Sequence, residues 1–63
     1  MNISEAREKC GITQQELAKR LSVTQGAVSQ WENGIVFPRV TMLKKIADVL
    51  KCPVDELLRE REA

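Results

Sequence analysis

The chain has 63 residues, of which 43% are hydrophobic and 30% charged, and its formal net charge is +1. A chain of this length buries only about 60% of the surface that its unfolded form exposes, so it supports one small core and leaves no room for a deep catalytic pocket. It also lacks histidine, the commonest general base and metal ligand. An enzyme is therefore not expected, and neither are a cofactor and a metal site.

The positive charge is concentrated in the first part of the chain. Residues 1–45 carry seven Lys or Arg and four Asp or Glu, whereas residues 46–63 carry three and five. This asymmetry suits contact between the first part and a polyanion. No apolar run approaches the roughly 20 residues of a membrane helix, and the N-terminus does not resemble a signal peptide. The expected location is cytoplasmic, without membrane contact.

The two cysteines, Cys10 and Cys52, have neither CxxC spacing nor histidine partners, which argues against a zinc site. A disulfide between them is possible by count. An intracellular location favours the alternative, in which both thiols stay reduced and pack as small apolar side chains without a function.

The first predicted helix covers about residues 3–10. Asn2 can cap it, with Glu5 at the spacing of a capping-box partner, and Gly11 suits the left-handed residue that ends a helix. Its apolar face would consist of Ile3, Ala6 and Cys10.

The next two helices are predicted at about 14–21 and 25–32. Thr13 opens the first through a T-x-x-E capping box, and Thr24 caps the second. Gly34 ends the second helix. The inward faces would carry Leu17, Ala18, Leu21, Val28 and Trp31. Trp31 is interpreted as a core residue rather than a base-stacking one, because it shares a face with Val28.

The opposite face of the 25–32 helix is polar, with small or amide side chains at Gln25, Gly26, Ser29, Gln30 and Asn33. Such a row suits reading base edges in a DNA groove. Gly26 costs roughly 1 kcal/mol of helix propensity relative to alanine, which is either sequence noise or a sign that the backbone approaches something closely.

The last two helices are predicted at about 40–50 and 54–60, with fraying at residues 60–63. Pro53 lies beside the start of the last helix. In the loop before Pro38, Phe37 and Val36 either pack against the protein or belong to a dimer patch, and packing is the favoured interpretation for Phe37. The apolar face of the first of these helices would carry Val40, Leu43, Ile46, Ala47 and Leu50, and that of the second Leu57 and Leu58.

The string TQQELAKRLSVTQGAVSQWENG, followed by Pro38, KIADVL and VDELL, resembles the Cro/xenobiotic-response-element-type helix-turn-helix family, which has the lambda-repressor-like fold. The resemblance covers about residues 3–58. It implies an all-α, compact five-helix domain spanning residues 1–63. The helix-turn-helix would be formed by 14–21 and 25–32, with 25–32 in the major groove. Family members are transcriptional regulators that often bind as dimers.

On this basis the sequence predicts three groups of site residues. Base contacts are assigned to Gln25, Gly26, Ser29 and Gln30. Phosphate contacts are assigned to Gln14, Thr24, Asn33 and Arg39, although Gln14 and Thr24 also suit capping and Asn33 also suits a plain helix end. The resemblance further implies a largely buried Arg7–Glu32 ion pair. Only a minority of the surface cations are expected to touch DNA; they are Lys9, Lys19, Arg20, Lys44 and Lys45.

Three positions depart from the family pattern. Ser22 replaces a common glycine, so a strained turn is expected. The segment Ile35–Phe37 is apolar where relatives often carry Lys or Arg, which favours a protein contact over a phosphate contact. Arg39 stands where a capping residue is usual, so the following helix is expected to start less sharply.

The function predicted from the sequence is a double-stranded-DNA-binding transcriptional regulator, specifically a repressor, bound as a homodimer to a palindromic operator. The alternative is a protein-interaction module on the same fold, such as an antitoxin or an adaptor. The polar outer face of the 25–32 helix favours DNA, because a protein interface would favour apolar or aromatic anchors there.

Overall fold

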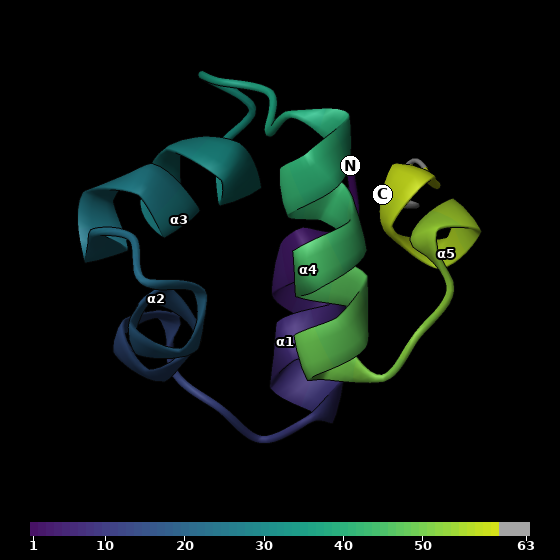
Figure 1. The fold of residues 1–63 in the computed structure, drawn as a ribbon, viewed down its shortest axis with the longest axis horizontal. Helices are drawn as coiled ribbons and strands as arrows, with labels where there is room; N and C mark the ends of the chain where they lie inside the picture. The colour runs from purple at the N-terminus through teal and green to yellow at the C-terminus, as the bar shows by residue number, and fades with distance from the viewer. Residues whose placement is uncertain (60–63) are drawn as a thin grey trace.

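The computed structural model describes residues 1–59, which form five α-helices and no strand (Figure 1). The helices are α1 (Ile3–Lys9), α2 (Gln14–Leu21), α3 (Gln25–Glu32), α4 (Val40–Leu50) and α5 (Val54–Leu58). In Figure 1, α2 and α3 lie on one side of α4 and α5 lies on the other. The expected all-α class is confirmed. None of the described helices has the length and apolarity needed to cross a membrane.

One apolar core joins all five helices. Its buried members are Ile3, Ala6, Leu17, Ala18, Leu21, Val28, Trp31, Leu43, Ile46, Ala47, Leu50 and Leu57. Trp31 is among them, so its interpretation as a core residue is confirmed. The backbone N–H of Asn2 donates to the carbonyl of Leu57 at 2.8 Å, which ties the start of the chain to α5. The core thus holds α2 and α3 in a fixed relation to the rest.

Two threonines cap the helices that form the helix-turn-helix. Thr13 Oγ1 accepts from the backbone N–H of Glu16 at 3.1 Å, and Thr24 Oγ1 accepts from that of Ala27 at 3.2 Å. The expected cap at Asn2 is wrong: the side chain makes no capping bond, and its buried Oδ1 has no partner. Asn2 has ψ of 34° rather than the extended backbone that an N-cap requires.

The first and last helices, α1 and α5, end sooner than the sequence predicts. α1 ends at Lys9, with Cys10 as its C-cap and Gly11 left-handed at φ 72°. α5 ends at Leu58 because the backbone of Arg59 is extended. Residue 60, and with it the predicted fraying of residues 60–63, lies outside the described residues.

Four apolar side chains expected inside are exposed. Val40 is 68% exposed because it starts α4, and the buried row of that helix begins one turn later at Leu43. Phe37 is 69% exposed, since Pro38 takes the buried position beside it. Leu58 and Cys10 are exposed as well. Ile35 and Val36 are exposed too, so the segment Ile35–Phe37 and the nearby Val40 leave an apolar surface open before and at the start of α4.

Candidate nucleic-acid interface

The turn between α2 and α3 depends on a left-handed serine. Ser22 has φ 58° and ψ 40°, a conformation that costs roughly 1–2 kcal/mol for a residue other than glycine. The turn is held by backbone bonds, because the N–H of Val23 donates to the carbonyl of Ala18 at 2.9 Å. The strain expected from the sequence at this position is therefore present in the backbone.

This turn and the buried Val28 and Trp31 direct the opposite face of α3 outward. Gln25, Gly26 and Gln30 are exposed and Ser29 is half-buried. The first turn of α3 contains no acidic residue. The surface that α3 offers is therefore polar and free of negative charge where the helix begins.

Gly26 is not required by the fold around it. A Cβ placed there would meet only Thr24 Oγ1, at an ordinary contact distance of 3.8 Å, and the residue does not have positive φ. The folded chain therefore has space for a side chain at position 26. A requirement for glycine there would have to come from a bound partner.

An ion pair anchors the end of α3 to α1. Arg7 Nε donates to Glu32 Oε2 at 2.7 Å and Arg7 Nη2 to Glu32 Oε1 at 3.3 Å, and Arg7 Nη1 donates to the carbonyl of Ile12 at 2.8 Å. The two side chains are only 14% and 6% exposed. The hydrogen bond to Glu32 raises the pKa of Arg7, against the lowering effect of burial. These are the two residues that the family resemblance pairs.

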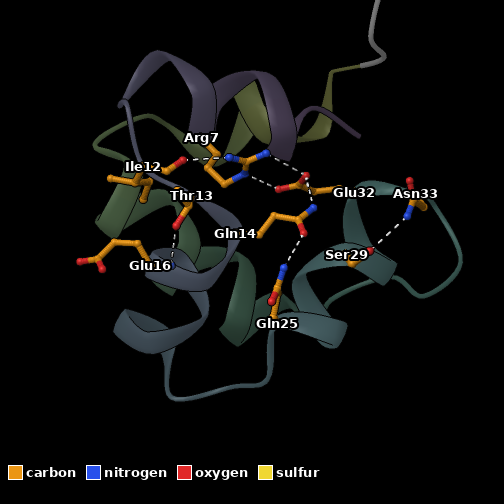
Figure 2. A network of polar contacts seen from close by, with 9 residues as sticks. All are labelled: Arg7, Ile12, Thr13, Gln14, Glu16, Gln25, Ser29, Glu32 and Asn33. Atoms are coloured by element: carbon orange, nitrogen blue, oxygen red, sulfur yellow. Dashed lines mark hydrogen bonds and ion pairs between the residues drawn. The ribbon is translucent and has the colours of Figure 1, made fainter.

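The ion pair is linked to the start of α3 through Gln14, as Figure 2 shows. Gln14 Nε2 donates to Glu32 Oε1 at 2.9 Å, so the Oε1 of the Gln14 amide is left for another partner. Gln25 Nε2 donates to that oxygen at 3.4 Å, a long contact. The chain Arg7, Glu32, Gln14, Gln25 thus runs from the protein interior to the exposed beginning of α3.

This chain gives the Gln25 amide one contact on the protein side. One Nε2–H faces Gln14, which leaves the other N–H and the Oε1 of an exposed side chain available. A neighbouring donor and acceptor in one plane is the pattern with which glutamine pairs with adenine in the major groove.

The other predicted contact residues are arranged separately. Asn33 Nδ2 donates to Ser29 Oγ at 3.3 Å, so the Ser29 hydroxyl keeps its own proton for a further acceptor. Thr24 is exposed while its oxygen serves the cap of α3. Arg39 is exposed at the N-cap of α4, where its side chain makes no capping bond.

The link between Gln14 and Glu32 was not predicted from the sequence. The two residues are 18 positions apart, and their contact arises only when the start of α2 packs beside the end of α3. No periodicity or capping pattern pairs them. In the described part of the chain, no group of His, Cys, Asp or Glu side chains could hold a metal ion.

Comparison with known proteins identifies the family of this chain. A helix-turn-helix family model matches residues 3–57. The HTH-type transcriptional activator BcrR of Enterococcus faecalis is 35% identical over 60 residues, which cover 95% of this chain and 29% of BcrR. The chain therefore spans less than a third of that relative's length. The family model covers nearly the whole chain, so the resemblance seen in the sequence is confirmed. The chain belongs to the helix-turn-helix family of Cro/C1 type.

Proposed function

We propose that this chain is the double-stranded-DNA-binding part of a transcriptional regulator and that α3 reads sequence in the major groove. The observation that carries the proposal is the exposed Gln25 amide at the start of α3, linked through Gln14 to the largely buried Arg7–Glu32 pair. Recognition helices contact base edges with their N-terminal residues. The family membership and the name of the relative support the same activity.

Gln25 is proposed to pair with adenine, accepting from N6 and donating to N7, which discriminates against other bases by roughly 1–3 kcal/mol. Ser29 and Gln30 contact neighbouring bases from the same face, and Gly26 lets the backbone approach the groove. Phosphate contacts come from Thr24, Asn33 and Arg39, and from Gln14 through its remaining N–H and the free amides at the start of α2.

Selection of bound duplexes from a random pool tests sequence specificity directly. On the selected site, Gln25→Ala should weaken binding about tenfold or more while leaving binding to a random duplex nearly unchanged. Gln14→Ala should weaken binding to both duplexes, and cost part of the specificity by releasing Gln25. Equal losses on both duplexes for Gln25→Ala would show that Gln25 only positions the backbone.

The operator is proposed to be palindromic and bound by a homodimer. One α3 reads only a few base pairs, so a domain of this size gains useful specificity from a second copy, with half-sites about one helical turn (~34 Å) apart. The open apolar surface at Ile35–Phe37 and Val40 supports a second copy of this chain as the partner, and Leu58 on α5 is a further exposed apolar residue. A footprint covering one asymmetric half-site under full occupancy would contradict the dimer.

The same apolar surface would also serve the alternative function, a module that binds another protein. The two functions are separated by the selection experiment, because an adaptor would enrich no duplex. Repression remains a prediction from the resemblance, whereas the relative is named an activator. A reporter placed behind the selected site decides the direction of regulation.

A further inference from the structure

Two thiols lie near the place where the ends of α1 and α4 meet. Cys10 Sγ donates to the carbonyl oxygen of Leu50 at 3.0 Å. Cys52 follows Leu50 by two residues, and the left-handed Lys51 between them turns the chain so that the N–H of Cys52 donates to the carbonyl of Ala47 at 3.0 Å. In place of the functionless reduced thiols expected from the sequence, we propose that Cys10 and Cys52 form a reversible intramolecular disulfide that ties the end of α1 to the turn between α4 and α5.

The two thiols have different access to solvent, which assigns their roles. Cys10 is exposed and lines a hollow of about 210 Å³ together with Arg20 and Lys51. Cys52 is half-buried and packs against the core. Burial raises the pKa of the Cys52 thiol, with further contributions from Glu56 and Cys10. Cys10 is the thiol that an oxidant reaches first, and Cys52 is the resolving thiol.

The oxidant is a peroxide, and the reaction balances in two steps. The Cys10 sulfur attacks one peroxide oxygen, the O–O bond breaks, and sulfenic acid and one water form. The Cys52 sulfur then attacks the Cys10 sulfur, the S–O bond breaks and the second water leaves. In total two thiols lose two electrons and two protons, and one peroxide is reduced to two waters.

The disulfide would raise the stability of the domain and leave the exposed polar face of α3 unchanged. Cys10 and Cys52 are 42 positions apart, so closing the bond constrains a large part of the unfolded chain, including all of α2, α3 and α4. The Gln25 face lies on α3, which neither cysteine adjoins. Oxidation would therefore stabilise the domain without changing which bases it reads.

The test treats the reduced 63-residue chain with one equivalent of hydrogen peroxide in native buffer. The mass of the monomer should fall by two hydrogen atoms, both thiols should disappear, and dithiothreitol should reverse both changes. The melting temperature of the oxidised monomer should rise by roughly 10 °C or more. Under the same conditions Cys52→Ser should gain oxygen and Cys10→Ser should stay largely reduced, and neither variant should lose two hydrogens.

A comparison in denaturant distinguishes a pair held close by the fold from an accidental one. Closure should be at least tenfold faster in native buffer than in concentrated urea, because the fold raises the effective concentration of one thiol at the other. Closure that is no faster in native buffer would overturn the proposal. So would disulfides formed only between molecules, or an oxidised monomer that melts below the reduced one.

Discussion

Gly26 is the residue at which stability and DNA binding should respond in opposite directions. The folded chain has space for a methyl group there, and glycine in a helix costs roughly 0.5–1 kcal/mol relative to alanine. We expect Gly26→Ala to stabilise the free domain by about that amount and to weaken binding to the selected duplex. Urea denaturation and a binding titration measure the two effects.

If Gly26→Ala bound DNA as tightly as the original chain, the backbone of α3 would not approach the groove closely at this position. Ala27→Gly serves as the control. Because Ala27 is half-buried and packs against the core, Ala27→Gly should lower the stability of the free domain by a similar amount. It should bring no gain in affinity for the selected duplex.

Single residues also mark the limit of prediction from the sequence. Thr13 and Thr24 were correctly predicted as caps because the bond of each cap is local, reaching a backbone N–H three residues on. Phe37 was wrongly expected to pack, because its burial depends on which neighbour reaches the core, and Pro38 does. Asn2 has the spacing of a cap, but its backbone is set by the bond to Leu57 of a distant helix.

At the scale of the elements, the α2–α3 turn stores strain that a single change can release. Ser22 is left-handed, and glycine adopts this conformation without the side-chain clash but loses more entropy on folding. Ser22→Gly should therefore stabilise the domain by roughly 0.5–1 kcal/mol, seen as a higher melting temperature. Ser22→Val introduces a β-branched side chain and should lower the melting temperature. Equal melting temperatures for the two variants would show that the turn is unstrained.

The ion pair between α1 and α3 should contribute far more than a surface pair. Arg7 and Glu32 are 14% and 6% exposed, so removing either leaves a largely buried charge, and Arg7→Ala or Glu32→Ala should each cost about 3–5 kcal/mol. Arg20→Ala is the matched control, because the exposed Arg20–Glu16 pair should contribute only about 0–1 kcal/mol.

Chemical denaturation of the three variants measures these costs. Losses below about 1 kcal/mol for both Arg7→Ala and Glu32→Ala would show that the pair behaves as a surface contact. Glu32→Ala should additionally loosen the Gln25 amide, since Gln14 loses the acceptor that orients it.

The elements themselves were largely predictable because their signals are local. The bounds of α2, α3 and α4 coincide with the helices predicted from capping and apolar spacing, whereas α1 and α5 end one and two residues sooner. The burial of side chains in the first and last turns of a helix was less predictable. Val40 matches the spacing of Leu43 and Leu50, yet it is exposed, and the buried row of α4 begins only at Leu43. The link from Gln14 to Glu32 could not be predicted at all, since it depends on how two helices approach each other.

At the scale of the whole molecule, the apolar surface should control assembly on DNA. Phe37 is 69% exposed, so Phe37→Ser should change the stability of the monomer by no more than about 0.5 kcal/mol. On a palindromic duplex it should weaken binding about tenfold and abolish cooperativity, while binding to an isolated half-site stays the same. Gel-shift titrations of both duplexes measure this.

Phe37→Leu is the control, because it keeps an apolar side chain and should retain most of the cooperativity. Equal affinity of Phe37→Ser and the original chain on the palindrome would exclude this surface from the dimer contact.

The burial of Arg7 and Glu32 determines how the fold responds to ionic strength. Mobile ions screen a buried pair far less than an exposed one, whereas affinity for a duplex falls steeply with salt because each phosphate contact releases counterions. Rising salt should therefore detach this domain from DNA while its fold persists. The slope of log affinity against log salt then counts the phosphates it contacts, undisturbed by unfolding.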